Sequence, residues 1–428
     1  MTTAAELAAG GLAAGGLAAG GAAAGAAGGT RLRATPALAA AALEDYAASY
    51  GASVLDLDRA LAAAPGPADF IDLTHGDTRA FAPPAAAAAD FAAAVEENTE
   101  AYTAYRGSAS LRTALAPRLA RLLGRPVDGA SEVIVTPGTQ GGLFTALSAL
   151  VSPGDTVALP DPEYFMSERI IAYLGGKARR LPVSQDGAGL LSISSDALAA
   201  AADADLLVLS HPNNPTGGVY RGDTLQALAA MVTAGDMLAV VDQLYCRLIF
   251  AGAQYLHLGS LPGLAERTVT LLGPSKTESM SGYRVGVAVG PAPVVDAMER
   301  VLSLTALRTG GYSQQVLRHW MADDYAWLAK RAAAHEAIRD DLVARLRTIS
   351  GVSVAPPAGS SYVFPDASGT ALGRNDHELA VALKAAGVLV SPGYQFGPSG
   401  RGRFRINFSQ DARRLSVAVD LIAAVLSS

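Results

Sequence analysis

One lysine of this chain stands in a setting suited to covalent chemistry. Lys276 lies in the stretch GPSKTESMSGYRVG among small and hydroxylated residues, and Arg284 follows in the same stretch. A lysine in a partly desolvated, electropositive site becomes a nucleophile toward carbonyl groups and forms Schiff bases. An isolated Ser-Lys pair is more often a solvated turn. The rest of the chain must therefore supply the other parts of a site.

Two polar turns earlier in the chain are suited to binding an anion and a planar ring. The turn TPGTQ at 136–140 joins an apolar segment to a helix, and N–H groups at a helix N-terminus bind anions. The turn DPEY ends at Tyr164 after the next apolar segment, which places an aromatic ring near the same edge. Each signal is weak alone, because such turns are common and Tyr164 could simply pack in the core.

Two later turns carry more specific signals. The loop HPNNPTG at 211–217 is fixed by two prolines and a glycine, which leaves Asn214 to present its side-chain amide. Asp242 ends the apolar run LAVV, and Tyr245 follows it closely. A carboxylate that ends a buried strand is either a helix cap or the partner of a cationic group.

The elements that must position these residues alternate between helices and short apolar strands. We expect helices at 37–48, 54–63, 83–100, 111–123 and 140–150, and strands at 70–73, 132–136, 156–159, 204–209, 237–241 and 268–272. This alternation predicts an α/β protein whose mostly parallel central sheet has helices on both faces. Because ligands bind at the carboxyl ends of such strands, the polar turns should meet there.

The last third of the chain predicts a smaller α/β unit. We expect helices at 325–346, 376–386 and 412–426, and strands at 352–355, 361–364, 388–391 and 404–408. Turns of this unit that could line the substrate side carry Ser360, Ser361, Tyr362 and Tyr394.

Composition limits the possible partners and compartments. With 428 residues, 50% hydrophobic and 17% charged, the chain can bury a large core in two subdomains. A net charge of −6 gives no support for a nucleic-acid partner. The single cysteine, Cys246, fits a reducing compartment, and no cysteine-based metal site is expected. Residues 1–30 form an Ala/Gly-rich low-complexity tail rather than a membrane or signal segment, so we expect a cytoplasmic protein.

Taken together, these motifs resemble the class I/II aminotransferase family of fold-type I pyridoxal phosphate (PLP) enzymes. The resemblance rests on the order GTQ, PNNPTG, Asp-x-x-Tyr, SK and RVG, and runs from about residue 72 to the C-terminus. It implies PLP as cofactor, an α-amino acid substrate and a homodimer with shared active sites. It also implies a large PLP-binding domain at 76–310 and a small domain from 31–75 and 311–428.

The resemblance implies a role for each motif residue. Lys276 would carry the Schiff base to PLP and move the substrate proton, with Asp242 and Tyr245 as the other catalytic groups. Asp242 would keep the ring nitrogen protonated, and Arg284 would bind the phosphate. The implied cofactor-binding set is Gly138, Thr139, Gln140, Tyr164, Asn214, Asp242, Tyr245, Ser275, Lys276 and Arg284, with Tyr102 contributed by a second subunit.

On the substrate side, Arg405 in GRFRINF matches the family arginine that binds the α-carboxylate. Apolar residues alternate with it, so one face of its strand must be buried, and Arg403 is the same-face competitor. Gly76 matches a backbone amide for the same carboxylate, Asn214 would also face the substrate, and His75 could do so.

Several positions depart from the family pattern and leave the reaction open. Gly273 stands where relatives have a phosphate-binding serine, Gln243 where a glutamate often follows the aspartate, and HGDTR at 75–79 where a loop like GEPDF is usual. Arg308 only weakly matches an arginine that reads dicarboxylate side chains, and Arg79 could also face the substrate.

Transamination is the leading hypothesis for the reaction. The alternatives are elimination or replacement at Cβ or Cγ, including enzymes that use S-adenosylmethionine, and oxidation or hydroxylation of an amino acid. A catalytically inactive binding protein of the same fold is the third possibility.

Overall fold

The fold is that of a computed structural model which describes residues 35–43, 52–98 and 100–427. The predicted tail at 1–30 lies outside these ranges. Of the helix predicted at 37–48, the described part forms the short α1 (Pro36–Ala40), which ends in a turn, and residues 44–48 lie outside the described ranges.

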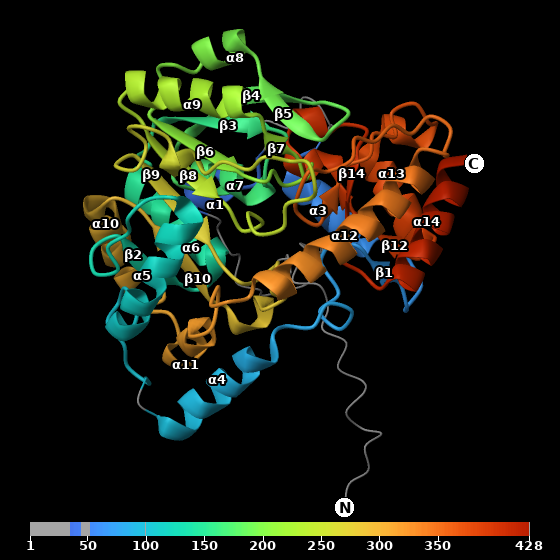
Figure 1. Ribbon diagram of the computed structural model, residues 1–428. Coiled ribbons are helices and arrows are strands. Elements are labelled where there is room, and N and C mark those ends of the chain that lie inside the picture. The colour runs from blue at the N-terminus through green and yellow to red at the C-terminus, as the bar shows by residue number, and fades with distance from the viewer. Residues whose placement is uncertain (1–34, 44–51, 99, 428) are drawn as a thin grey trace, which may run out of the picture.

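A nine-stranded sheet forms the centre of the larger part of the molecule (Figure 1). Its strands, in spatial order, are β2 (Val133–Thr136), β10 (Gly286–Val289), β9 (Thr268–Leu272), β8 (Leu238–Asp242), β6 (Leu206–Ser210), β3 (Thr156–Asp161), β4 (Lys177–Gln185), β5 (Leu190–Ile193) and β7 (Val219–Tyr220). The run from β9 to β4 is parallel, whereas β10 is antiparallel to both neighbours and β5 to β4. The predicted mostly parallel sheet is confirmed.

Helices cover both faces of this sheet, and the side chains of β6 show how. Leu207 and Leu209 pack with α8 (Ser195–Ala199) and α9 (Gly222–Ala234). Leu206 and Val208 point the other way, toward α6 (Gly138–Leu150), α7 (Phe165–Tyr173) and α10 (Ala292–Leu304). Because both faces are buried, the central strands appear in the sequence as short continuous apolar runs.

The sequence analysis missed four strands of this sheet: β4, β5 and β7 at one side, and β10 near the other. β4 reads KARRLPVSQ, with several charged residues and mixed exposure, so it lacks the apolar run that marks a buried strand. β7 has two residues.

A third core beside β2 and β10 contains α4 (Ala85–Glu97), α5 (Ala109–Leu123) and the segment around Leu317 and Trp320.

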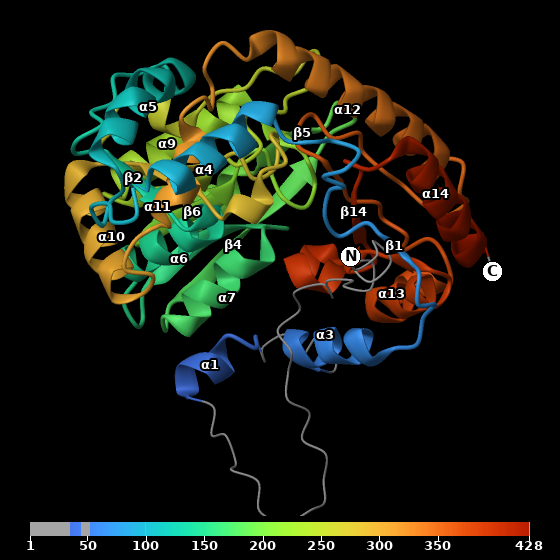
Figure 2. The same cartoon turned by 90° about the horizontal axis from the view of Figure 1, so that it is seen from below.

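A smaller unit is built from both ends of the chain. Its core holds α12 (Tyr325–Leu346), α13 (Asp376–Ala385) and α14 (Ala412–Ser427) around a sheet of order β11 (Tyr362–Val363), β14 (Phe404–Asn407), β13 (Ser391–Pro392). β1 (Ile71–Asp72) pairs in parallel with β12 (Val388–Leu389). Figure 2 shows α3 (Val54–Ala63) beside α13, where the Lys384 ammonium donates to the Leu61 carbonyl at 2.9 Å.

Two of the predicted strands in this unit are corrected. The segment 388–391 divides at Val390 into β12 and β13, which belong to different sheets. The segment 352–355 forms only an isolated bridge between Ser353 and Asp366. The domain boundaries themselves stay predictions.

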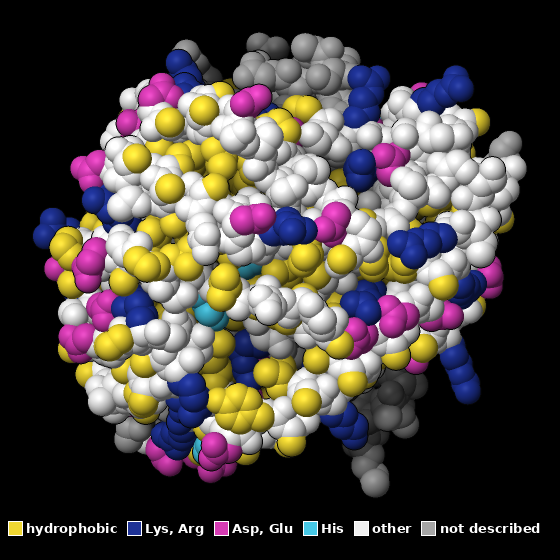
Figure 3. Space-filling model, turned by 45° about the horizontal axis from the view of Figure 1, so that its top comes forward, with side chains coloured by type: hydrophobic (Ala, Val, Ile, Leu, Met, Phe, Trp, Pro, Cys, Tyr) yellow, Lys and Arg dark blue, Asp and Glu magenta, His cyan; other side chains and the backbone are white. Residues whose placement is uncertain are grey.

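On the face drawn in Figure 3, Lys and Arg side chains alternate with Asp and Glu, with no broad field of one sign. Within the described ranges, no helix has the length and apolar character needed to cross a membrane.

Candidate active site

The predicted polar turns meet at the carboxyl ends of three adjacent strands. Ser210 at the end of β6 pairs with Asp242 at the end of β8, and Asp242 pairs with Leu271 in β9. The loops that follow these strands carry Asn214, Tyr245 and Lys276. The parallel register therefore brings residues from distant parts of the chain to one edge.

A cavity of about 260 Å³ opens at this edge. Most of the predicted cofactor residues line it: Thr139, Gln140, Tyr164, Asn214, Asp242, Tyr245, Ser275, Lys276 and Arg284, together with Arg405. Thr74, Phe165, Ser210, Leu244, Ser281 and Tyr362 complete the wall.

A second cavity of about 640 Å³ adjoins the first. Lys276 lines both cavities, whereas His75, Gly76 and Arg79 line only the second. Tyr102 lines neither cavity and is 86% exposed. Every predicted site residue except Tyr102 and Gly138 therefore lines one of the two cavities that share Lys276, and the roles of these residues stay predictions.

One end of the first cavity is built to receive an anion. Helix α6 begins at Gly138, whose φ is +72°, and a Cβ there would lie 2.6 Å from a guanidinium nitrogen of Arg284. One guanidinium nitrogen of Arg284 donates a hydrogen bond to the Ser281 carbonyl at 3.0 Å. The buried Ser275 hydroxyl has no hydrogen-bond partner among the described residues. A helix N-terminus, an arginine and a free hydroxyl form a site for a phosphate-like group.

The turn that carries Lys276 packs closely against this helix. A Cβ at Gly273 would lie 3.1 Å from the Thr139 methyl carbon, tighter than an ordinary contact. The glycine that departs from the family pattern therefore lets this turn approach α6.

The carboxylate of Asp242 lies at the cavity wall and inside the protein. Burial raises its pKa to about 6, although the N–H of Leu244 and the charge of Lys276 oppose this rise. The Leu244 N–H donates to Asp242 at 3.1 Å. A cationic group placed against this carboxylate would relieve the cost of its burial.

Arg405 also lines the first cavity and is held there by three hydrogen bonds. Its guanidinium donates to the side-chain oxygen of Asn214 at 2.8 Å and to the Thr74 carbonyl and the Ser391 hydroxyl at 3.0 Å each. The ring of Tyr362 lies 4.1 Å below it. The buried Nε of Arg405 has no partner in the described chain, so this arginine retains binding capacity.

The competitor Arg403 is placed differently. It forms an ion pair with Asp366 at 2.9 Å and is partly exposed. The geometry therefore selects Arg405, which lines the cavity, over its neighbour.

Two phenols extend the polar surface between Lys276 and Arg405. The Tyr245 hydroxyl donates to the Tyr362 hydroxyl at 2.8 Å. Burial raises the pKa of Tyr245. Burial acts the same way on Tyr362, but the nearby Arg405 and Lys276 charges outweigh it and lower the pKa of Tyr362. Of the four turn residues expected near the substrate, Tyr362 and Ser361 line the cavities.

The remaining uncertain positions have structural contacts. Arg308 donates to the Thr103 carbonyl at 2.5 Å and lies against the ring of Tyr102. The Gln243 side-chain oxygen lies 2.6 Å from Nδ1 of His257.

Two polar residues at this edge were not predicted as part of the site. Ser210 lines the cavity, and Glu163 lies buried behind it in contact with Ser210. A short motif does not show which side chains become buried together, so no signal in the sequence pointed to this pair.

The fold and the site together are typical of one class of enzyme. In this class, a lysine in the loop after a strand shares a cavity with a site for an anion and with an arginine that can bind a second ligand. A family model for aminotransferase class I and II matches residues 68–422, and the chain belongs to that family. The predicted family, fold and reaction class are confirmed.

Individual relatives agree with this assignment. A probable aspartate/prephenate aminotransferase of Thermus aquaticus is 31% identical over 360 residues, which cover 84% of this chain and 92% of the relative. An arginine–pyruvate transaminase of Pseudomonas aeruginosa is 29% identical over 377 residues, 88% of this chain and 95% of the relative. The crystal structure of an aspartate aminotransferase from Rhodobacter sphaeroides has a TM-score of 0.81 and 39% identity, and covers 85% of this chain and 94% of that one.

Proposed function

We propose that this aminotransferase binds PLP in the cavity around Lys276 and transfers the amino group of an α-amino acid. The observation that carries this proposal is the unpartnered Ser275 hydroxyl beside Arg284 at the start of α6. These groups fit the phosphate of PLP, because a dianion needs a cation and several donors together.

The other walls fit the remaining parts of the cofactor. Asp242 would hold the ring nitrogen, because its carboxylate in the cavity wall has a raised pKa and would be stabilised by a cationic partner. Asn214 and Tyr245 would bind the ring oxygen, Tyr164 would lie against the ring, and Lys276 would hold the aldehyde carbon.

When bound, PLP acts as an electron sink for negative charge at the substrate α-carbon. The residues of the chain orient the substrate and move its proton. Arg405 would bind the α-carboxylate, with the Gly76 amide as a second donor. Lys276 lines both cavities, so its amine could take the proton from the α-carbon and return it elsewhere.

We also propose that two chains share their active sites in a homodimer. Tyr102 and Leu304 are each 86% exposed in the single chain, so both are available to a second chain. A second chain would bury such residues and bring Tyr102 to the phosphate of its neighbour. Light scattering should give twice the mass of 43.5 kDa expected from the sequence.

The decisive experiment combines a spectrum with product analysis. Purified protein incubated with PLP should show visible absorbance that Lys276→Ala abolishes. A donor panel should include aspartate, arginine and aromatic amino acids, because relatives are named for such substrates. A keto acid that appears together with the aminated cofactor supports transfer. Loss of a Cβ or Cγ substituent without amination of the cofactor would support elimination instead, and a protein that never binds PLP would refute the proposal.

A further inference from the structure

A buried carboxylate behind the cavity wall has no role in the chemistry described so far. Glu163 accepts four hydrogen bonds from neutral donors. One oxygen accepts the N–H of Tyr164 at 2.7 Å and the hydroxyl of Ser210. The other accepts the N–H of Ser210 at 3.0 Å and the side-chain amide of Asn213 at 3.3 Å.

This arrangement requires a carboxylate at position 163. Both oxygens of Glu163 face donors, and a glutamine could offer only one acceptor oxygen, so its amide nitrogen would oppose an N–H group. Burial raises the pKa of Glu163 to about 7, against the hydrogen bonds from Ser210 and Tyr164. Because burial of the Glu163 carboxylate costs free energy, we expect a function that requires it at this position.

The hydrogen bonds continue from Glu163 into the active site. The Ser210 hydroxyl oxygen that faces Glu163 also accepts the backbone N–H of Asn214 at 2.9 Å. The Asn214 side-chain oxygen in turn accepts from Arg405 at 2.8 Å. A continuous chain of contacts therefore runs from Glu163 through Ser210 and Asn214 to Arg405.

A second branch from Glu163 fixes the same loop. Asn213 donates to Glu163, and its own side-chain oxygen accepts the N–H and the hydroxyl of Thr216 at 3.2 and 2.7 Å. The loop is therefore held on both sides of Asn214. Because Ser210 pairs with Asp242 across adjacent strands, this scaffold also borders the catalytic carboxylate.

We propose that Glu163 is a positioning residue that acts through Ser210 to set the Asn214 amide and, with it, the guanidinium of Arg405. This inference rests on the proposed function, because Asn214 and Arg405 are the groups expected to contact the cofactor and the substrate. Glu163 itself touches neither ligand.

The test is Glu163→Gln in the full-length protein loaded with PLP. Repulsion between N–H groups should displace the loop, so the substrate KM should rise about tenfold while kcat falls less. The pH midpoint of the visible absorbance should shift upward, because Asn214 would stabilise the ring oxygen less well. A purely structural residue would change thermal stability without moving this midpoint.

Ser210→Ala provides a second route to the same result and does not depend on whether the first variant folds. It keeps the carboxylate but removes the atom that connects Glu163 to Asn214. The single variants should change KM and the absorbance midpoint in the same direction. The double variant should be little worse than either single variant, because both interrupt one chain of contacts.

Glu299→Gln is the matched control, since Glu299 is a partly buried carboxylate that binds Arg106, and neither residue lines the two cavities. It should leave both readouts unchanged. If wild-type protein does not take up PLP, the proposed function fails. If wild-type protein takes up PLP but both site variants keep its KM and absorbance midpoint, only the positioning role of Glu163 is refuted.

Discussion

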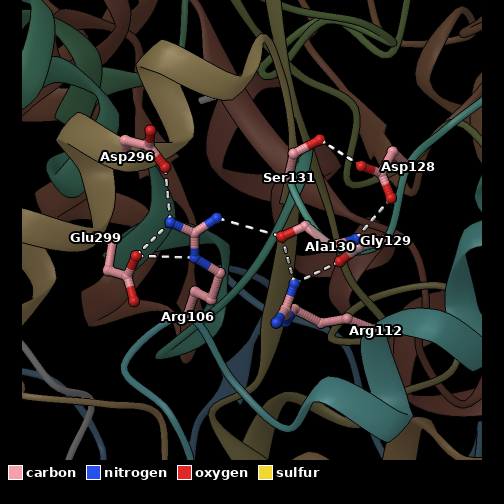
Figure 4. Close-up of polar contacts among 8 residues, drawn as sticks. All are labelled: Arg106, Arg112, Asp128, Gly129, Ala130, Ser131, Asp296 and Glu299. Carbon is pink, nitrogen blue, oxygen red and sulfur yellow. Dashed lines mark hydrogen bonds and ion pairs between the residues drawn. The ribbon is translucent and has the colours of Figure 1, made fainter.

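Two arginine-rich regions of the large unit use similar groups in different ways. In the first, all three guanidinium nitrogens of Arg106 have partners on Glu299, Asp296 and the Ala130 carbonyl (Figure 4). Arg112 likewise donates to two backbone carbonyls of the same loop. This region connects α10 to the loop before β2 and leaves little capacity for a ligand.

The second region is the cavity around Lys276, where donors remain open. Arg284 uses one of its donors on the Ser281 carbonyl, and the Ser275 hydroxyl and Nε of Arg405 are buried without partners in the described chain. Open donors are costly to bury unless a ligand satisfies them.

One carboxylate from each region shows the same contrast, because its pKa is shifted in opposite directions in the two regions. Hydrogen bonds from Ser131 and Ala130 lower the pKa of the exposed Asp128. Burial raises the pKa of Asp242 to about 6. Hydrogen bonds within the fold stabilise the charged form of Asp128, whereas the charged form of Asp242 would be stabilised by a further positive charge. The difference indicates that one polar region stabilises the fold and the other is prepared for a ligand.

Of the changes that test the difference between the two regions, removal of Lys276 should have the largest effect on activity. Lys276→Ala should lower kcat/KM by about 10³-fold or more, because anchoring and proton transfer are both lost. Steady-state assays of keto acid formation and the visible spectrum measure the effect. Retention of substantial activity would place the chemistry elsewhere.

Replacement of an arginine by lysine should have different effects in the two regions, on activity in one and on stability in the other. Arg405→Lys should lower kcat/KM about 100-fold, mainly through KM, because an ammonium cannot reproduce a planar, forked donor. Arg106→Lys should instead lower the free energy of unfolding by about 1–2 kcal/mol and leave kcat/KM unchanged. Kinetics and urea denaturation of both variants test this pair. A kinetic defect in Arg106→Lys would remove the distinction between the regions.

The sequence predicted the candidate active site better than the Arg106 region, for a physical reason. Lys276, Asp242 and Asn214 each follow an apolar strand, and parallel strands end at one edge, so the sequence pattern alone indicates that these residues meet. The Arg106 contacts join residues nearly two hundred positions apart without a motif. The strand β4 was missed because its residues are charged and partly exposed.

Other parts of the site could not be predicted because they depend on tertiary packing. The resemblance to the family marks Gly273 as a departure from its usual serine, but only the structure shows its close approach to Thr139. Glu163 was visible within DPEY, yet its burial against Ser210 depends on the pairing of β3 with β6.

The pH dependence of stability should separate the two kinds of carboxylate. Asp242 and Glu163 have folded pKa values of about 6 and about 7, above their ordinary values of 3.8 and 4.5. The folded state therefore binds protons more tightly, and stability is lost as pH rises through this window. For PLP-free protein, we expect a loss of about 2–3 kcal/mol per group between pH 4 and pH 8.

Urea denaturation across this range measures the slope. Asp242→Asn should remove the Asp242 share of the slope, because the side chain is then neutral at every pH, and leave the share of Glu163. Asp128→Asn should not change it above pH 5, since a lowered pKa contributes stability that is lost only as pH falls further. A wild-type profile without slope would contradict the burial argument.

Two glycines that pack against arginines give the smallest and most selective test. A Cβ at Gly138 would lie 2.6 Å from the guanidinium of Arg284, and its φ of +72° disfavours any side chain. Gly138→Ala should therefore weaken PLP binding about tenfold by displacing the phosphate ligand.

The matched change in the structural region is Gly129→Ala. A Cβ at Gly129 would lie 2.6 Å from the backbone carbonyl oxygen of Arg112, so the backbone itself must shift. We expect a loss of about 2 kcal/mol of stability with unchanged affinity for PLP, because no open donor is disturbed. Fluorescence titration with PLP and urea denaturation of both variants measure the two effects. Gly138→Ala would crowd a guanidinium that lines the cavity, whereas Gly129→Ala would crowd a backbone carbonyl, so opposite readouts would separate a region that binds PLP from one that stabilises the fold.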